Sequence, residues 1–430
     1  MFSDNIFIRR PPVKNTIVAI DIGTSKICTV IAKVNNANQI EILGKGMYSS
    51  RGIKKGVIID IESASKAIRN CIAQAEASSN LKVISAYVNI SKMHVDVLDI
   101  RNSIDISTQD KEVSRKNVND LLKMSSLLET PENTQIIDVI PRQFIVDGYD
   151  GIVDPVGMAG TKLEIDCDIV LGKITSVQNI LKSLEKVNVK VDGFIVDAFC
   201  LSELLIGPEE KEMGALLIEI GACKTEVSAF KNNKMVFYEY LPIGGDHITN
   251  DISIGLKISY NEAERIKRQY ELALTSLIKN DQEVFVTDMN DNKRKVIKVS
   301  QIVEIIEARV YEIFHLCKEL LKKENVSGAF NAGIILSGAG ISYVDGAVQL
   351  ANEAFRMSAR VSSYRALGVS KPEYAVALGI VRYINNKGHS ASQNQVGSYL
   401  HSNKNQEKDV LRKIIKKIIR KIIKIINKIF

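Results

Sequence analysis

Two glycine turns with an acidic residue on their N-terminal side are the segments of this 430-residue chain best suited to chemistry. The first turn (residues 21–26) and the second turn (residues 219–225) each join two apolar, β-branched stretches, so the pattern strand, turn, strand occurs twice. Glycine lets backbone N–H groups approach a phosphate, and a carboxylate can hold a hydrated divalent cation. We therefore expect both turns to close on the same phosphates. The residues predicted to do so are Asp21, Gly23, Thr24, Ser25, Lys26, Glu219, Gly221 and Ala222, with Asp21 and Glu219 holding Mg²⁺ through water.

Two further glycine clusters follow along the chain. Gly244 and Gly245 stand immediately before a predicted helix, whose first N–H groups would point at an anion. The run Gly338–Gly340, with Ala339 at its centre, follows a buried strand, and backbone without side chains can lie flat against a nucleoside. Each cluster alone is also explained as a tight connection between a strand and a helix. The four glycine features in this order predict a nucleotide site.

The last twenty residues, 411–430, contain only Leu, Ile, Phe, Lys, Arg and one Asn. On a helical wheel the apolar side chains fill one half and the cations the other. No uncharged run approaches the roughly 18 residues that a transmembrane helix needs, so this helix should lie on an anionic membrane. A core helix, a coiled-coil helix and a calmodulin-type target are the alternatives, but a polar linker at 385–410 favours the membrane. The expected membrane contacts are Lys413, Ile414, Ile415, Lys416, Lys417, Ile418, Arg420, Lys421, Ile422, Lys424, Ile425, Ile426 and Ile429.

The net charge of +7 belongs to this terminal segment. Its eight cations and absence of acids leave residues 1–410 with a net charge of −1, which argues against nucleic-acid binding. The six cysteines form no CxxC pair and have no His partner at metal-ligand spacing, so we expect buried, reduced thiols. The N-terminus lacks the apolar stretch of a signal peptide. The body is therefore expected in the cytoplasm, meeting the membrane from inside.

Several longer segments identify a family. The most specific is LPIGGDHITNDISIGLKISYNEAERIK at 241–267. Others are 20–26, 44–56, 85–94, 139–144, 157–165 and 372–382. In these segments, and from about Asn15 to Asn385 as a whole, the chain resembles the bacterial cell-division protein FtsA, a family within the actin, Hsp70 and hexokinase superfamily.

The resemblance implies an α/β fold: an actin-like, two-lobed ATPase body with an inserted SHS2-like subdomain, called 1C, and a C-terminal amphipathic helix. The implied divisions are 1–86 and 174–205 for the first lobe, 87–173 for the insert, 206–384 for the second lobe, 385–410 for the linker and 411–430 for the membrane helix. Within the second lobe, the family's subdomain 2B would occupy about 245–328.

The resemblance also implies ligands and partners. Glu264, Lys267 and Arg268 should contact the ribose and adenine of ATP, and Arg309 in the predicted helix 301–323 should pair with the acidic C-terminal tail of FtsZ. Head-to-tail self-association and contacts with other division proteins are further expectations. The expected location is the cytoplasmic face of the cell membrane at the division site.

This chain departs from the family pattern at the second turn. Cys223 stands where a glycine is usual, and Lys224, which could neutralise phosphate charge, where a threonine is usual. Asp197 replaces an amide that orients the attacking water in many relatives, and it is the one candidate for a catalytic base. These departures favour ATP binding with weak or no hydrolysis.

Two other functions stay open at this level. A phosphotransferase of the sugar-kinase branch would need an Asp general base in the cleft and has no use for a membrane helix. The pilus assembly protein PilM shares the insert and the nucleotide fold but reaches the membrane through a partner's peptide.

Overall fold

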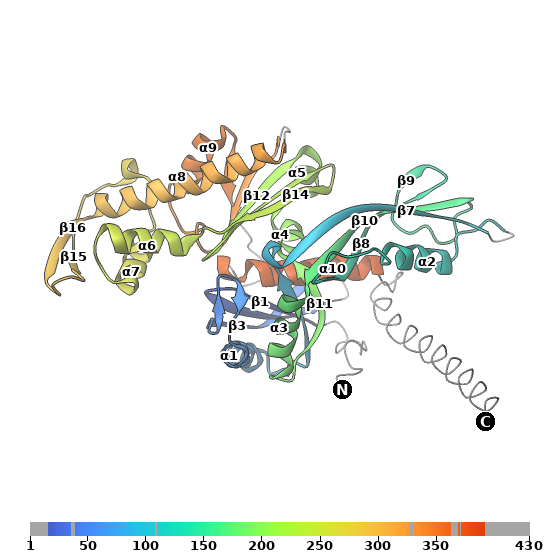
Figure 1. Cartoon of the computed structure of the whole chain (residues 1–430), viewed down its shortest axis with the longest axis horizontal. Helices are drawn as coiled ribbons and strands as arrows, with labels where there is room; N and C mark the ends of the chain where they lie inside the picture. Colours follow the sequence, from blue (N-terminus) through green and yellow to red (C-terminus); the bar gives the residue numbers. More distant parts are fainter. Residues whose placement is uncertain are drawn as a thin grey trace, which may run out of the picture. The chain divides into compact units, whose positions relative to one another are not determined.

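The computed structural model divides into two compact units (Figure 1). The smaller unit contains Asp96–Gly172, and the larger contains Pro11–Val95 and Lys173–Asn386. The terminal segment 411–430 and its predicted membrane contacts lie outside the described residues. Within the described part, no helix combines the length and apolar character needed to cross a membrane. The structure describes residues 16–35, 39–107, 110–326, 330–362, 369 and 371–391.

The first lobe of the larger unit is a five-stranded sheet with the strand order β11-β6-β1-β2-β3. β1 and β2 form an antiparallel hairpin, and β6 lies parallel to both β1 and β11. Its elements are β1 (Thr16–Ile22), β2 (Lys26–Val34), β3 (Ile40–Ser49), β4 (Ile53–Lys54), β5 (Val57–Ile58), α1 (Ile61–Ser79), β6 (Ser85–Ile90), η1 (Lys92–His94), α3 (Ile174–Glu185), β11 (Lys190–Val196), α4 (Asp197–Leu205), η3 (Pro372–Tyr374) and α10 (Ala375–Ala391).

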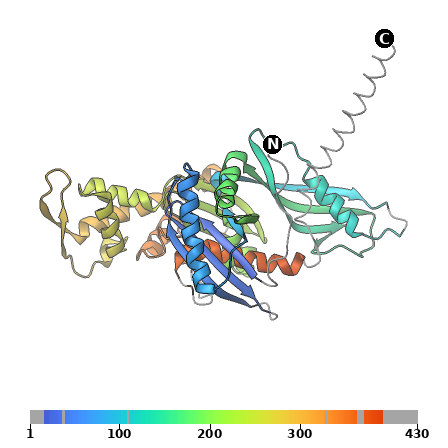
Figure 2. The same cartoon turned by 90° about the horizontal axis from the view of Figure 1, so that it is seen from below.

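Two glycines let the helix α1 pack closely on the edge of this sheet. A Cβ at Gly44 would lie 2.3 Å from the Ala75 carbonyl oxygen, and one at Gly46 would lie 2.0 Å from that of Cys71. Figure 2 shows α1 (blue) on one face of the sheet with α3 (green) beside it. The side chain of Asp60 caps α1 by accepting from the Ser63 N–H. This close packing fixes the β1–β2 hairpin that carries the first turn.

The second lobe repeats this arrangement with the strand order β14-β13-β12-β17-β18. β12 and β13 form an antiparallel hairpin, and β17 lies parallel to β12. Its elements are α5 (Pro208–Met213), β12 (Ala215–Ile220), β13 (Thr225–Lys231), β14 (Lys234–Leu241), α6 (Gly245–Gly255), α7 (Tyr260–Tyr270), η2 (Thr275–Leu277), β15 (Glu283–Thr287), β16 (Arg294–Lys298), α8 (Val299–Lys323), β17 (Gly333–Ser337), α9 (Ala347–Phe355) and β18 (Ala359–Val361).

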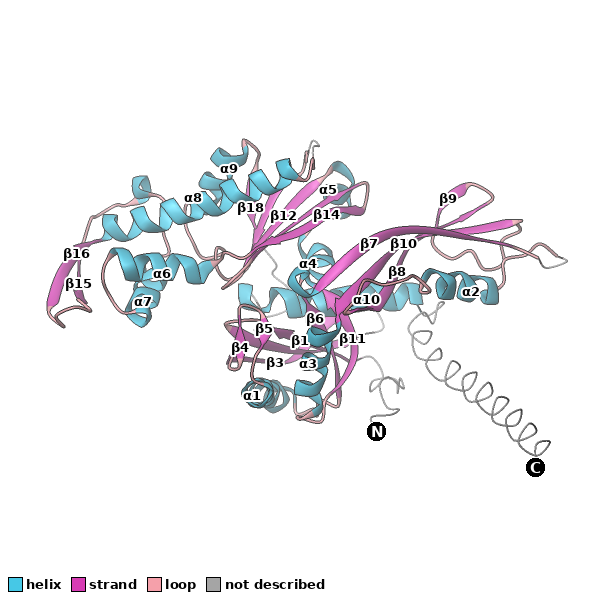
Figure 3. Ribbon diagram, in the orientation of Figure 1, coloured by secondary structure: helices cyan, strands magenta, loops and turns pink. Residues whose placement is uncertain are grey.

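The long helix α8 supplies much of the second lobe's core. Its apolar side chains recur at helical spacing and are fully buried at Ile302, Ile306, Val310 and Ile313. Burying each such side chain contributes roughly 1.5 to 3 kcal/mol. Figure 3 shows α8 running from the β15–β16 hairpin to the sheet of the second lobe. The helix predicted over 301–323 is therefore present and begins two residues earlier.

The smaller unit is a four-stranded sheet, with the order β7-β10-β8-β9, that shares one apolar core with a helix. Val118, Leu121 and Leu122 of the helix are buried in that core, and Ser114 caps the helix in a capping box with Asn117. The elements are β7 (Val95–Asp105), α2 (Arg115–Ser125), β8 (Thr134–Val146), β9 (Tyr149–Ile152) and β10 (Lys162–Lys173).

Two predicted boundaries are wrong. The insert was expected to begin at residue 87, but β6 pairs with β1 and β11, so the smaller unit begins at Asp96. The linker was expected to begin at residue 385, but α10 continues to Ala391. Asn385 is buried, and the Asn386 Nδ2 donates to Glu203 of α4 at 2.8 Å. These polar residues, which suggested a linker, therefore belong to α10 and contact the rest of the larger unit.

Candidate functional site

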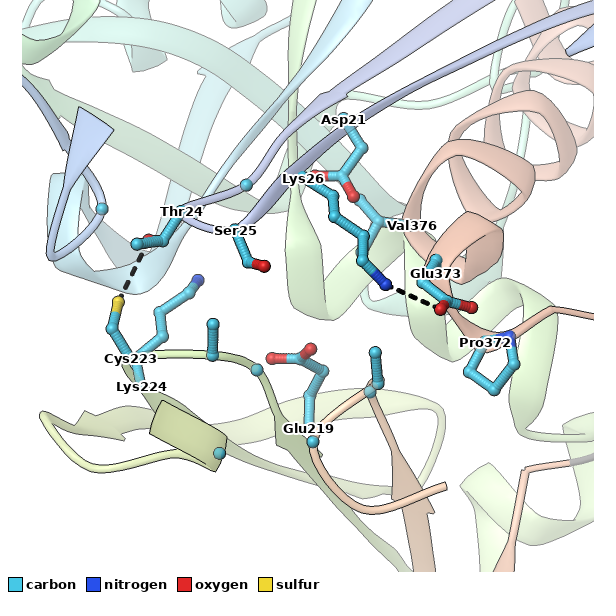
Figure 4. Close-up of a pocket in the computed structure, with 18 of the residues that line it drawn as sticks. Asp21, Thr24, Ser25, Lys26, Glu219, Cys223, Lys224, Pro372, Glu373 and Val376 are labelled. Carbon is cyan, nitrogen blue, oxygen red and sulfur yellow. Dashed lines mark hydrogen bonds and ion pairs between the residues drawn. The ribbon is translucent and has the colours of Figure 1, made fainter. Parts of the chain in front are cut away.

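A cavity of about 220 Å³ opens in the larger unit where the two turns face each other (Figure 4). The Thr24 Oγ1 and Cys223 Sγ atoms are 3.1 Å apart across it. Every residue predicted to contact phosphate, nucleoside or metal lines this cavity except Gly244, which is the N-cap residue of α6. Asp197 lines it too. The topology thus brings together residues that are more than 300 positions apart in the sequence.

The two turns share one backbone geometry. In the first turn the Gly23 N–H donates to the Lys26 carbonyl oxygen at 3.0 Å. In the second, the Gly221 N–H donates to the Lys224 carbonyl oxygen at 2.9 Å. Each hydrogen bond closes the end of a β-hairpin, and residues of both turns line the cavity.

The glycines around the second turn serve backbone packing. Gly338 has φ +95°, and a Cβ there would lie 2.3 Å from the Ile220 carbonyl oxygen and 2.7 Å from Glu219 Oε1. A Cβ at Gly340 would lie 2.8 Å from the Ile220 oxygen. Gly338 is therefore also required by its close approach to the second turn, and its contact with a nucleoside stays a prediction.

The N-terminus of α6 has a different role from the predicted one. The Gly245 N–H donates to the Gly221 carbonyl oxygen at 2.9 Å, and the Asp246 N–H donates to that of Ala222 at 2.7 Å. These amides are already engaged, so the prediction that they point at an anion is wrong. They hold the second turn in place instead.

Two partly buried carboxylates flank the cavity, with Asp21 on one side and Glu219 on the other (Figure 4). Burial, followed by the charge of Asp197, raises the pKa of Asp21 to about 8. Burial also raises the pKa of Glu219 to about 8, with the charges of Glu226 and Asp197 adding to it and that of Lys224 opposing it. Among the described residues, no three His, Cys, Asp or Glu side chains converge as a metal cluster. These two carboxylates fit a hydrated Mg²⁺ that takes its other ligands from phosphates and water.

Asp197 and Lys224 form an ion pair on the floor of the site. The Lys224 Nζ donates to Asp197 Oδ2 at 3.2 Å and to Glu226 Oε1 at 2.8 Å. The charges of Glu226 and Asp197 raise the pKa of Lys224 above its usual range despite the opposing effect of burial. Its charge is thus committed to buried carboxylates, contrary to the suggestion that it neutralises phosphate.

Lys26 of the first turn pairs with a different carboxylate, that of Glu373. Its Nζ donates to Glu373 Oε1 at 2.7 Å (Figure 4). The other Glu373 oxygen accepts from the Tyr343 hydroxyl at 2.7 Å. All three side chains line the cavity. Hydrogen bonds from Lys26 and Tyr343 outweigh partial burial and lower the pKa of Glu373.

The helix α7 contributes a cluster of charged residues. The Lys267 Nζ donates to Thr249 Oγ1 at 2.6 Å and to the Gly245 carbonyl oxygen at 3.1 Å. Glu264 forms ion pairs with Lys267 at 2.7 Å and with Arg268 at 2.6 Å. These side chains lie beside the glycine run 338–340 that also lines the cavity.

Sequence reasoning missed several lining residues. Asn89 Oδ1 accepts from the Ile22 N–H at 2.7 Å, and Glu373 and Tyr343 form the contact described above. The Ser337 hydroxyl is buried, lines the cavity and has no hydrogen-bond partner. Asn89 falls inside the segment 85–94 that carries the family resemblance, so it was detectable. Glu373 likewise falls inside the segment 372–382, and Ser337 directly precedes the glycine run 338–340, whereas no local pattern marks Tyr343.

Arg309 lies outside this cavity. It forms ion pairs with Asp251 of α6 and with Glu312, one turn along α8. All three side chains line a shallow groove that also contains Ile254 and Ile305. Arg309 therefore already has two acidic partners within the chain, and its pairing with an FtsZ tail stays a prediction.

Two lobes, each built on a hairpin turn with a parallel strand beside it, enclose one cavity, and this arrangement defines the actin-like class of folds. Two solved structures have a similar fold. The PilM-PilN type IV pilus biogenesis complex is similar with a TM-score of 0.60 and 15% identity over 85% of this chain and 97% of that one. MreB5 of Spiroplasma citri bound to ADP is similar with a TM-score of 0.56 and 13% identity over 89% of this chain and 100% of that one. At these identities the likeness is one of fold alone.

The family follows from sequence comparison. The profile of the family "Cell division protein FtsA" matches residues 216–379, and that of the "SHS2 domain inserted in FTSA" matches residues 93–171. The cell division protein FtsA of Bacillus subtilis (strain 168) is 31% identical over 366 residues, which cover 85% of this chain and 82% of that protein. The chain belongs to the FtsA family, and this membership supports a role in cell division.

Proposed function

We propose that this protein binds ATP·Mg²⁺ in the cavity between its two turns, self-associates, and tethers FtsZ filaments to the cytoplasmic face of the cell membrane at the division site. Family membership supports the division role. The observation that carries the nucleotide part is the meeting of both glycine turns at one cavity. A similar fold has been solved with bound ADP, which supports an adenine nucleotide.

The lining residues suggest a division of roles. The backbone of the two turns would face the phosphates, and Lys26 would add a positive charge once it leaves Glu373. Asp21 and Glu219 would hold Mg²⁺ through water. Glu264, Lys267 and Arg268 would contact ribose and adenine next to Gly338–Gly340, and the unpartnered Ser337 hydroxyl is available to the ligand.

The terminal helix 411–430 would supply the membrane contact. One amphipathic helix of this kind binds reversibly, because its isoleucine face is short and its cations act through a screened surface potential. Self-association would place many such helices on one surface and raise the avidity. The polymer, rather than the single chain, would then hold FtsZ at the membrane.

The groove beside α6 and α8 is the candidate site for the FtsZ tail. Its exposed Ile254 and partly buried Ile305 offer apolar contact, and Arg309 offers a cation. An acidic tail would have to replace Asp251 or Glu312 as the partner of Arg309. Arg309→Glu is therefore expected to weaken the binding of an FtsZ C-terminal peptide by more than about tenfold. Fluorescence anisotropy with the labelled peptide measures this, with Arg265→Glu on the exposed face of α7 as the matched control.

Co-sedimentation with anionic vesicles tests the tether itself. The full chain should carry FtsZ into the pellet, whereas a chain ending at residue 410 should bind FtsZ and leave both proteins in the supernatant. Ile418→Glu with Ile422→Glu should reproduce the truncation, because each puts a charge into the apolar face. Vesicle binding by the truncated chain, or FtsZ that stays in the supernatant with the full chain, would contradict the proposal.

A further inference from the structure

Both oxygens of the Asp197 carboxylate are engaged by neighbouring side chains. Asp197 is the first residue of α4 and is almost completely buried. The Asn89 Nδ2 donates to its Oδ1 at 3.1 Å, and the Lys224 Nζ donates to its Oδ2 at 3.2 Å. Asn89 in turn accepts from the Ile22 N–H in the first turn. A continuous chain of hydrogen bonds therefore runs from the first turn through Asp197 to the second.

Lys224 is fixed from its other side as well. Glu226 Oε1 accepts from the Lys224 Nζ at 2.8 Å and from the Lys92 N–H at 2.8 Å. Glu226 Oε2 accepts from the buried Tyr238 hydroxyl at 3.2 Å. The ammonium group thus lies between two buried carboxylates whose own positions are set by other groups. It is held in place rather than free to follow a ligand.

This arrangement bears on ATP hydrolysis. In that reaction a water oxygen bonds to the γ-phosphorus while the bond from that phosphorus to the β,γ-bridging oxygen breaks, giving ADP and inorganic phosphate. The water must be oriented by an acceptor, which takes the proton that the water loses. Asp197 is the acidic side chain at the junction of both turns, but an ammonium ion at 3.2 Å competes with water for its Oδ2.

Resting on the proposed ATP-binding function, we propose that Lys224 is a positioning residue that occupies Asp197, so that the site retains ATP instead of hydrolysing it. The lysine supplies the positive charge that keeps the buried carboxylates together and links the two turns. The same bond keeps the Asp197 carboxylate from orienting water. Retention of ATP is thus a property of one residue rather than of the whole site.

ATP turnover by the full chain with Mg²⁺ tests this role. Lys224→Thr frees Asp197 Oδ2 and is expected to raise kcat by about tenfold or more while KM changes by less than about threefold. Adding Asp197→Asn to this variant should return kcat to the level of the unsubstituted chain, and Lys224→Arg should not raise it. Lys211→Thr is the matched control, because Lys211 is similarly buried and pairs with Glu203 outside the cavity. It should leave kcat unchanged.

The outcomes separate the two proposals. Unchanged kcat in a Lys224→Thr chain that still binds ATP would overturn the role of Lys224, as would a gain that survives Asp197→Asn. If the threonine variant does not fold, Lys224→Met, which keeps most of the side-chain length without the charge, is measured in its place. Absence of ATP binding by the unsubstituted chain would instead overturn the nucleotide function itself.

Discussion

The first and second turns are closed by the same backbone hydrogen bond, but their lysine side chains have different partners. Each carries a lysine near its C-terminal end. Lys26 reaches across the cavity to Glu373, a partly exposed partner, whereas Lys224 reaches inward to the buried Asp197 and Glu226. The repeated hairpin therefore places the two lysines at equivalent positions, and the surrounding residues determine which partner each ammonium group pairs with. We therefore expect Lys26 to exchange its partner for a phosphate and Lys224 to keep its buried partners.

The two turns are also supported differently. Backbone groups of two other segments pack on the second turn, because glycines at 244, 338 and 340 allow their close approach. The first turn is braced by side chains, with the Ser50 hydroxyl donating to the Gly23 carbonyl oxygen at 2.7 Å. The second turn should consequently tolerate fewer changes around it than the first.

The largest effect is expected from Gly338→Val. The valine Cβ would lie 2.3 Å from the Ile220 carbonyl oxygen at a positive φ, and overpacking with strain of this kind costs about 3 kcal/mol or more. We expect a lower Tm and no ATP binding, measured by calorimetry. A variant with the Tm and affinity of the unsubstituted chain would show that the second turn does not depend on this packing.

Both turns carry an acidic residue with a raised pKa, Asp21 in the first and Glu219 in the second. These two residues predict that stability depends on pH. The pKa values of Asp21 and Glu219 are raised from 3.8 and 4.5 to about 8 on folding. The folded state then holds more protons than the unfolded state between these values, so the free energy of unfolding falls as pH rises, by up to about 1.4 kcal/mol per pH unit for each group.

Thermal unfolding of the nucleotide-free chain from about pH 5 to about pH 8 should therefore show a decreasing Tm. Asp21→Asn and Glu219→Gln should each flatten that decrease, because an amide does not titrate. Parallel slopes in the variants and the unsubstituted chain would exclude both carboxylates as its cause.

The two lysines should differ in their effect on ATP affinity. Lys26→Met should weaken ATP binding by about tenfold or more, because it removes the exchangeable cation of the first turn. Lys224→Thr should change the affinity by less than about threefold, because its charge is committed to Asp197 and Glu226. Calorimetric titration with ATP shows which variant loses more affinity. A larger loss in Lys224→Thr than in Lys26→Met would contradict the roles assigned to the two lysines.

The smallest effect should come from Glu373→Gln, which removes the competitor for Lys26. A partly exposed ion pair is worth up to about 1 kcal/mol, so ATP should bind up to about fivefold more tightly. The gain should disappear when Lys26→Met is already present. Persistence of the gain in that double variant would mean that Glu373 acts on the ligand by another route.

How far the sequence predicts this site depends on how local each feature is. The hairpins, the long helix α8 and the lining residues on the glycine turns follow from patterns within a few residues of one another. The ion pairs Lys26–Glu373, Lys224–Asp197 and Arg309–Asp251 join residues 27 to 347 positions apart, and no local pattern encodes them. The packing of Gly338 on the second turn is not predictable for the same reason, since only the fold places Ile220 against it.

The most direct test of the account is a double-mutant cycle on Asp21 and Glu219, with ATP affinity measured by calorimetry in the presence of Mg²⁺. If both turns hold the same Mg·ATP, each of Asp21→Asn and Glu219→Gln should weaken binding by about tenfold, and the double variant should be only slightly weaker than either. Losses that multiply, or a chain that binds no ATP, would contradict the claim that the two turns close on one nucleotide.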